Sequence, residues 1–235
     1  MAYNNDTETI LYGSTGSLET LYAYTRQSSI EEGTQLTRTG MPRAAGTEQE
    51  RVILEPDSLW ANASEPFTLA NTRDTTTVLI APGERVRHAE IIIHNVPNLQ
   101  YTGQFGGALS GLAPGVVMHS GELLDGCVTQ AFPCSVIDET TLLMRFRIFG
   151  HCPRQDEGLS NRHLLTVYAI LADGSKWYYT LDVTDQMHDK EKNPDIYHIY
   201  VDIGNGLPVP KPIVNGSGFQ PTIDGWQGVE INVDM

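Results

Sequence analysis

The sequence predicts an all-β protein built from β-sandwiches, and three observations support this prediction. The 235-residue chain contains 22 Gly and 13 Pro, which favour turns, and it has no long stretch of helical periodicity. Short apolar segments alternate with turn signals along the chain, a pattern typical of sandwiches. From Lys176 to Thr184, apolar and polar residues alternate with a period of two, as in a strand with one buried face.

The best-defined predicted element is a hairpin whose turn is Asp173-Gly174. An Asp-Gly pair readily adopts the two positive φ angles of a two-residue type I′ turn. Such a turn would place Ile170 opposite Trp177 and Tyr168 opposite Tyr179, so that large side chains meet across the strands. The first arm is apolar on both faces, which indicates a central strand covered on each side.

In the front third of the chain, the sequence pattern predicts a few short strands and one long loop. Residues 27–50 are polar, with scarcely any apolar anchor, and we expect a mobile loop there. A polar break follows at residues 71–74. We therefore divide the chain into a partial N-terminal β-sandwich domain, residues 1–73, and a C-terminal β-sandwich domain, residues 74–235. The strands expected before the break are Thr9–Tyr12, Leu18–Tyr24, Arg51–Leu54 and Phe67–Leu69.

The C-terminal part predicts more strands around the hairpin. The Gly-rich region from Tyr101 to Gly115 is expected to be irregular, and prolines 208, 210 and 212 indicate an extended or edge path. The expected strands are Thr76–Ile80, Arg85–Val96, Val116–His119, Gly126–Val136, Leu142–Phe149, Ile196–Ile203 and one over Val229–Val233.

Composition excludes several partner classes. The net charge is −14, which disfavours nucleic acid and anionic membrane surfaces because phosphate binding needs clustered Lys and Arg. The longest aliphatic runs, such as Ile91–Ile93, are far too short to span a bilayer.

A search for chemistry finds no catalytic, cofactor or metal site. Ser110 lacks the G-x-S-x-G frame, Gly204-Asn205-Gly206 lacks a third glycine and a following helix, and the seven histidines are scattered. Trp60, Trp177 and Trp226 are candidates for stacking on sugars or for the core. The acidic residues of one charged loop resemble calcium ligands in type but lack the spacing of a calcium loop, so we expect a solvated loop; they are Asp182, Asp185, Asp189, Glu191 and Asp195.

Several stretches together resemble a known family. They are YNNDTETILY, PRAAGTEQERVILEPDSLW, IIIHNVPNLQY, LADGSKWYYTLDVTDQ and GLPVPKPIVNGSGFQPTIDGW, starting at residues 3, 42, 91, 171 and 206. The chain is similar to the fimbrillin-like lipoproteins of the Bacteroidetes, in the branch that contains anchor and assembly proteins of type V pili. The resemblance implies two transthyretin-like β-sandwich domains, of which the first is N-terminally incomplete because the chain begins inside it.

The same resemblance implies a non-enzymatic protein without cofactors on the cell surface. The full-length form would be an outer-membrane lipoprotein, and this chain would reach the membrane only through a lipid anchor that it lacks. Expected partners are other fimbrial subunits or host and surface ligands. We expect a pilus anchor or assembly component that acts by strand addition at an open sheet edge. The alternative is a surface carbohydrate-binding or nutrient-capture module, and a hydrolase would need two carboxylates facing each other in a cleft.

The three cysteines predict one disulfide. If the strands on either side of residues 138–140 form a hairpin, Cys127 and Cys152 lie nearly opposite at its far end. An oxidising compartment, as the resemblance implies, permits the bond. Cys134 would then be a free, buried thiol.

Overall fold

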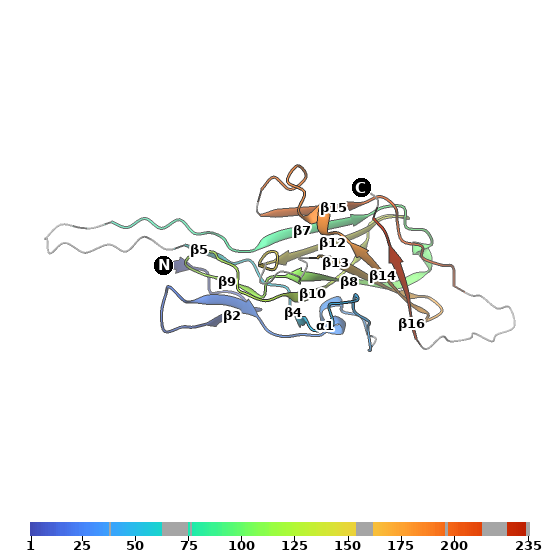
Figure 1. Ribbon diagram of the computed structural model, residues 1–235, viewed down its shortest axis with the longest axis horizontal. Helices are drawn as coiled ribbons and strands as arrows, with labels where there is room; N and C mark the ends of the chain where they lie inside the picture. The colour runs from blue at the N-terminus through green and yellow to red at the C-terminus, as the bar shows by residue number, and fades with distance from the viewer. Residues whose placement is uncertain are drawn as a thin grey trace.

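The computed structural model is nearly all β, which confirms the predicted class of β-sandwich (Figure 1). The structure describes residues 1–37, 39–62, 75, 77–153, 162–195, 197–212 and 225–233. Its strands form two larger sheets and two smaller ones. The transthyretin-like topology stays a prediction, and the predicted strand over Phe67–Leu69 lies outside the described residues.

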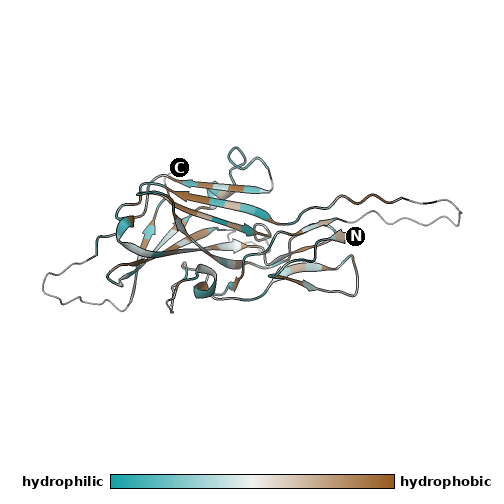
Figure 2. Ribbon diagram, turned by 180° about the vertical axis from the view of Figure 1, so that it is seen from behind, coloured by the Kyte–Doolittle hydropathy of each residue, from teal (hydrophilic) through white to brown (hydrophobic). Residues whose placement is uncertain are grey.

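Two sheets form the main sandwich. The six-stranded sheet has the order β16-β14-β13-β8-β10-β4, and the four-stranded sheet has the order β11-β12-β7-β15. Their strands are β4 (Arg51–Ile53), β7 (Arg87–Ile93), β8 (Thr102–Leu112), β10 (Val128–Pro133), β11 (Ser135–Val136), β12 (Leu142–Ile148), β13 (Leu164–Leu171), β14 (Lys176–Asp182), β15 (His198–Ile203) and β16 (Trp226–Ile231). Side chains from both sheets, such as Val167 and Met144, share one core. The hydropathy of the strands alternates accordingly (Figure 2).

A smaller core lies at the N-terminal end of the molecule, between two three-stranded sheets (Figure 1). One sheet is β2-β3-β9 and the other is β1-β5-β6. The strands are β1 (Ala2–Tyr3), β2 (Ile10–Gly13), β3 (Tyr22–Thr25), β5 (Trp60–Asn62), β6 (Gly83–Glu84) and β9 (Gly115–Val117). The division at residue 73 stays a prediction, and β6 and β9, which follow it in the sequence, pair with strands that precede it.

The hairpin of β13 and β14 forms, but its predicted register is wrong by one residue. Tyr168 lies opposite Tyr178, and Ala169 lies opposite Trp177. The reason is a three-residue loop: the Leu171 N–H donates to the Ser175 carbonyl at 2.9 Å, and Gly174 has a φ of +82°. The predicted inner face of β14 is nevertheless right, and β13 is buried along its whole length as a central strand.

The Gly-rich region is a long central strand, β8, so its predicted irregularity is wrong. Two of its glycines allow close packing against neighbouring elements. A Cβ on Gly106 would lie 2.6 Å from the Thr34 side chain, and one on Gly107 would lie 2.5 Å from the Phe132 ring. The missing side chains let other elements cover both faces of this strand. Over residues 77–80 the predicted strand does not form, and Thr76 lies outside the described residues.

Residues 27–50 cover the outer face of the six-stranded sheet, so the expectation that they lack apolar anchors is wrong. They contain helix α1 (Ile30–Thr34), whose N-terminus is capped by the Ser29 side chain. Ile30, Leu36 and Met41 are buried there with β13 side chains. In Figure 1, α1 lies beside β8 and β10 on the face opposite the four-stranded sheet. The predicted mobility of this segment stays a prediction.

Two short helices complete the fold. A 3₁₀ helix, η1 (Leu99–Tyr101), leads into β8, and α2 (Thr184–Met187) follows β14. Leu99 and Met187 both join the main core. No helix in the described part of the chain has the length and apolar character needed to cross a membrane.

Candidate functional site at the sheet edges

A β-sandwich that binds by strand addition needs an unpaired edge, so the state of each edge decides where such binding is possible. The β4 edge of the six-stranded sheet is covered. The Ser28 N–H donates to the Val52 carbonyl at 2.8 Å, and Gln27 forms an antiparallel bridge with Ile53. Residues 26–28 therefore occupy the place that an added strand would take.

The β15 edge of the four-stranded sheet is closed by side chains. Every second residue of a strand directs its N–H away from the neighbouring strand, here β7. The N–H of Tyr200 donates to Asn193 Oδ1 at 2.6 Å, and that of Asp202 donates to Gln186 Oε1 at 3.0 Å. His198 N–H donates to Asp195 Oδ1 at 2.7 Å. Three side chains thus occupy the N–H groups that a new strand would need as donors.

The acidic residues considered as calcium ligands lie at the end of β14 and in the segment that provides these caps. Asp182 accepts hydrogen bonds from Arg162 and from Thr184, and Asp189 accepts from the N–H groups of Glu191 and Lys192. These carboxylates stabilise turns and one ion pair. The interpretation of this loop as solvated, and not as a calcium site, stays a prediction.

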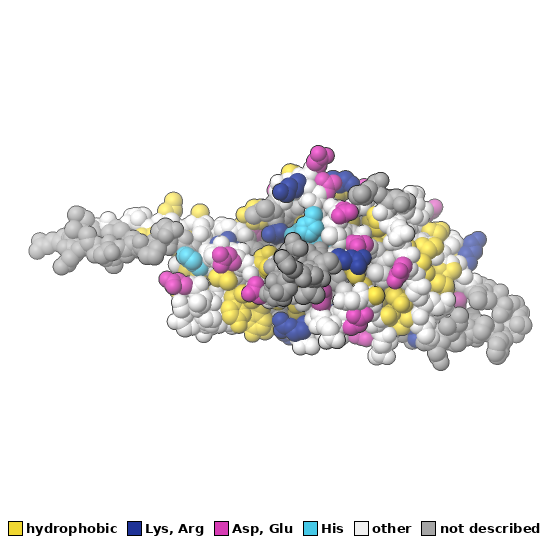
Figure 3. All heavy atoms as spheres, viewed as in Figure 1, with side chains coloured by type: hydrophobic (Ala, Val, Ile, Leu, Met, Phe, Trp, Pro, Cys, Tyr) yellow, Lys and Arg dark blue, Asp and Glu magenta, His cyan; other side chains and the backbone are white. Residues whose placement is uncertain are grey.

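The remaining edges of the main sandwich are β11 and β16. β11 has only two residues, whereas β16 has six and pairs with β14 on one side only, within the described part of the chain. β16 runs parallel to β14 and lies near the end of the molecule remote from the N-terminal sheets (Figure 1). Hydrophobic side chains reach the surface around this end in Figure 3.

The open strand β16 is held firmly by its side chains. Val229 and Ile231 pack against the main core, while Trp226 packs on the other face, 5.6 Å from the Tyr168 ring in an edge-on contact. Gly228 lies beneath Tyr178, whose ring occupies the space of a Cβ. β16 is thus an edge strand whose side chains hold it on both faces of the sheet.

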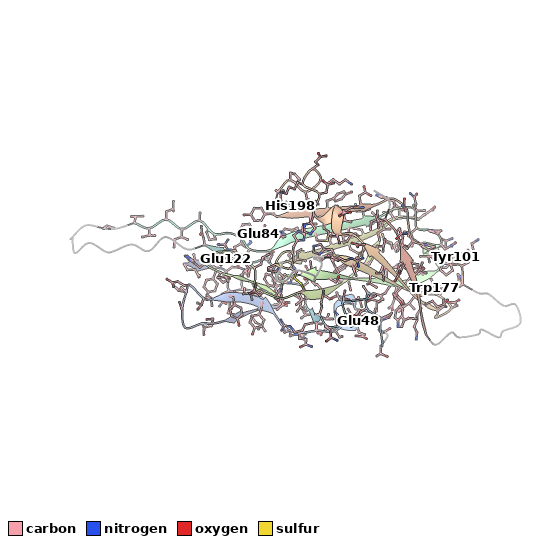
Figure 4. All side chains as sticks on the ribbon, viewed as in Figure 1. Glu48, Glu84, Tyr101, Glu122, Trp177 and His198 are labelled. Atoms are coloured by element: carbon pink, nitrogen blue, oxygen red, sulfur yellow. A yellow bond between two sulfur atoms is a disulfide. The ribbon has the colours of Figure 1, made fainter. Side chains whose placement is uncertain are left out.

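The tryptophans considered as sugar platforms occupy different environments. Trp177 and Trp226 are partly buried and pack against the cores, and Figure 4 shows Trp177 at the β16 end of the sandwich. Trp60 is 45% exposed at the N-terminal end. The three do not meet on one surface.

A groove of about 560 Å³ crosses the outer face of the four-stranded sheet. Its lining includes two ion pairs: Arg147 Nε donates to Glu55 at 2.9 Å, and Arg145 pairs with Glu90. His198, labelled in Figure 4, stacks on His88 at its rim with ring centroids 5.8 Å apart. Because its charged groups already pair with one another, the groove offers few free groups to a ligand.

Ser110 is not an activated nucleophile. Its hydroxyl oxygen accepts the Leu164 N–H at 3.0 Å, and His163 Nδ1 contacts the Ser110 carbonyl, not the hydroxyl. A nucleophile needs a base within hydrogen-bond reach of its own oxygen. The geometry at this serine therefore gives no support to acyl-transfer chemistry.

Three histidines that seemed scattered in the sequence converge in the structure. His151, His163 and His188 place one ring nitrogen each within 4.8 Å of the others. Burial, with the neighbouring histidines, lowers the pKa of His151 to about 3, and burial lowers the pKa of His163 to about 4. Separated by 12 and 25 residues, these histidines form no sequence motif, so sequence patterns could not find the cluster.

Cys127 and Cys152 lie close together, but the single hairpin from which their pairing was predicted does not form. Cys127 and Cys152 are joined by a disulfide with Cα atoms 5.1 Å apart. They do not end one hairpin, because β10 pairs with β8 and the chain changes sheet near Cys134. The Cys152 N–H donates to the Gly111 carbonyl, so both cysteines flank the end of β8. Oxidation of the pair in the protein stays a prediction.

Comparisons with known proteins show which family model and which solved structures this chain is similar to. A family model described as a domain of unknown function, DUF5119, matches residues 1–133, more than half of the chain. No curated protein matches the sequence. A candidate adhesin of Bacteroides ovatus ATCC 8483 has a similar crystal structure, with a TM-score of 0.63 and 19% identity over 91% of this chain and 74% of that one.

Two further solved structures align less well. The fimbrial anchor protein Mfa2 of Porphyromonas gingivalis has a TM-score of 0.45 and 12% identity, over 87% of this chain and 65% of that one. A second candidate adhesin of Bacteroides ovatus has a TM-score of 0.43 and 9% identity, over 87% and 63%. The resemblance to fimbrillin-like proteins is thus confirmed at the level of the fold.

Proposed function

Since the chain belongs to the DUF5119 family, whose function is unknown, we propose its role from its fold and edges: a non-enzymatic structural or adhesion protein of the cell surface. Within that role it is a fimbrillin-like pilus anchor or assembly component that binds other fimbrial subunits by strand addition. We further propose that it is an outer-membrane lipoprotein. The fold shared with a candidate bacterial adhesin and the sequence resemblance support this proposal.

The observation that carries the proposal is the contrast between the edges of the main sandwich. β4 is covered by backbone and β15 is capped by side chains, while β16 is long, anchored and paired on one side among the described residues. Exposed edges are an association hazard that proteins normally block. An edge left open beside two that are closed is best explained by a partner strand.

A site-specific cross-link tests this proposal. Glu230 is an exposed residue of β16, and the matched control Glu19 is exposed in the turn between β2 and β3. The variants Glu230→Cys and Glu19→Cys are labelled with a thiol-attached photo-cross-linker and mixed with pili sheared from cells that encode the chain. We expect a fimbrial subunit to cross-link from position 230 and not from position 19.

The same experiment can contradict the proposal. Equal cross-linking from both positions, or none from position 230 under conditions in which the pili bind, would rule out strand addition at β16. Hydrogen exchange gives an independent check, because an added strand should slow exchange of β16 amides selectively.

Surface carbohydrate binding is a second candidate, favoured by one observation. Tyr3 and Trp60 lie on neighbouring strands, β1 and β5, and are 42% and 45% exposed. Exposed aromatic rings can stack on sugar faces. Binding to a glycan array that is lost in Trp60→Ala and kept in the Glu230→Cys variant would favour this function over the pilus role.

A further inference from the structure

The three-histidine cluster is built by segments far apart in the sequence. His151 follows β12, His163 precedes β13, and His188 follows α2. His163 is fully buried, His151 is half-buried and His188 is exposed. The cluster therefore extends from the interior to the surface at one end of the main sandwich.

Hydrogen bonding fixes the orientation of the central imidazole. The Ser110 carbonyl can only accept a hydrogen bond, so His163 Nδ1, at 3.2 Å from it, carries the proton. In the neutral ring His163 Nε2 is then an unprotonated acceptor that points into the cluster. A backbone carbonyl that orients a histidine in this way is the usual second-shell partner of a metal ligand.

Two ring nitrogens from other histidines lie close to His163 Nε2. Hydrogen bonding alone cannot pair both of them with this single acceptor. His163 Nε2 lies 2.9 Å from His151 Nδ1 and 3.2 Å from His188 Nε2. One lone pair in the ring plane would have to accept both protons. A cation placed among the three would instead use one lone pair from each ring.

The spacing of the nitrogens also fits a metal ion. Zinc–nitrogen bonds of 2.0–2.1 Å at the tetrahedral angle place ligand nitrogens about 3.3 Å apart. The two short separations in the cluster are close to this value, and the exposed His188 ring is free to turn toward it. Imidazole ligands suit zinc, copper and nickel, whereas calcium and magnesium prefer oxygen.

We propose that His151, His163 and His188 bind one late first-row divalent cation, with Zn²⁺ as the representative ion and a fourth position open to solvent. The ion joins the end of β12, the start of β13 and the turn after α2. Its open position suits water or a single donor group from another molecule. This site is independent of the proposed strand addition at β16.

Two charged side chains act on the cluster from neighbouring positions. The positive charge of Arg87 acts on His151 and opposes a cation, while the negative charge of Asp182 acts on His163 and favours one. The two effects are opposite in sign.

Isothermal titration of the full chain with Zn²⁺ tests the proposal. His188→Gln removes an exposed ligand with little risk to folding, and His198→Gln is the control, because His198 forms a separate surface pair with His88. We expect one equivalent of Zn²⁺ to bind, at least a tenfold loss of affinity in His188→Gln, and unchanged affinity in His198→Gln.

Electron paramagnetic resonance with Cu²⁺ provides a second readout, which detects the ligand nitrogens directly. Bound Cu²⁺ should show hyperfine coupling to several imidazole nitrogens in the wild type and to fewer in His188→Gln. Unchanged Zn²⁺ affinity in His188→Gln, loss of binding in His198→Gln, or no binding at all would overturn the proposal.

Discussion

Asn193 closes the edge of β15 by accepting the Tyr200 N–H at 2.6 Å. Its own amide nitrogen donates to the Gln186 carbonyl at 2.9 Å, which holds the capping loop in place. A side-chain amide here replaces the carbonyl of a neighbouring strand. The edge is thereby protected without another strand.

Removing this cap should weaken the protein and expose the edge. We expect Asn193→Ala to lower the free energy of unfolding by about 0.5–1.5 kcal/mol, as for a typical hydrogen bond, and to increase self-association. Denaturant unfolding and sedimentation velocity measure the two effects. Asn193→Asp keeps the acceptor oxygen and should associate less than Asn193→Ala; equal association of both variants would contradict the capping role.

The glycines of β8 provide a test of close packing with an internal control. Gly107→Ala would place a methyl group 2.5 Å from the Phe132 ring, which stacks on Phe146. Overpacking of this kind typically costs about 1–3 kcal/mol. In Gly103→Ala the nearest atom is the Ile170 carbonyl oxygen at 3.6 Å, so that variant should be close to wild type in thermal unfolding. A similar loss of thermal stability in both variants would show that the close packing at Gly107 is not the cause.

The segment over the six-stranded sheet should resist proteolysis at Arg43. The Arg43 guanidinium donates to the Glu50 carbonyl at 2.6 Å and to Thr129 at 2.9 Å, and the Tyr168 hydroxyl donates to the Pro42 carbonyl at 2.6 Å. We therefore expect limited trypsin digestion to cut after the exposed Lys190 before it cuts after Arg43.

The variant Tyr168→Phe sharpens this test. It leaves the Pro42 carbonyl without its donor and should speed cleavage after Arg43 while leaving cleavage after Lys190 unchanged. Rapid cutting at Arg43 in the wild type would show that the segment is mobile, as its composition alone predicted.

Thiol counting tests the cysteine arrangement. Burial raises the pKa of the Cys134 thiol to about 12, so the reactive thiolate is scarce at neutral pH. We expect no fast-reacting thiol in the folded, unreduced protein and one after denaturation. Three thiols after denaturation would exclude the bridge between Cys127 and Cys152.

The bond between Cys127 and Cys152 closes a loop with a sequence separation of 25. It should therefore contribute about 3 kcal/mol to the free energy of unfolding.

Much of the fold was accessible from the sequence because it depends on local patterning. The all-β class and the inner face of β14 follow from a period of two. The register of the hairpin did not follow, because Asp173-Gly174 fits a loop of two or three residues equally well, and only the Leu171–Ser175 hydrogen bond selects the longer one.

The missed features depend on tertiary contacts. Three buried side chains, Ile30, Leu36 and Met41, suffice to anchor residues 27–50, although their spacing has no clear period. The side chains that cap β15 are not marked by any sequence motif. The same is true of His151 and His163, which meet only in the folded protein. The candidate site at β16 was predicted only as a strand, because an edge is a property of the whole sheet.

The last prediction concerns Asp57, which ties the N-terminal segment to the irregular segment that leads into β5. Its Oδ2 atom accepts the N–H groups of Glu8 at 2.7 Å and Thr9 at 2.8 Å, and its own N–H donates to Thr9 Oγ1 at 2.9 Å. Desolvation by burial alone would raise the pKa of Asp57, but these hydrogen bonds and the Arg147 charge outweigh it and hold the pKa below its ordinary value of 3.8.

A lowered carboxyl pKa means that the charged form stabilises the fold above pH 3.8, and that this stability is lost as the pH falls through the folded-state pKa. We therefore expect Asp57→Asn to lower the free energy of unfolding at pH 7 by about 1.5–3 kcal/mol, as for hydrogen bonds to a charged group. The difference from wild type should shrink below pH 3.8. Urea unfolding at a series of pH values measures it, and a difference that stays constant down to pH 2 would show that the Asp57 charge contributes nothing.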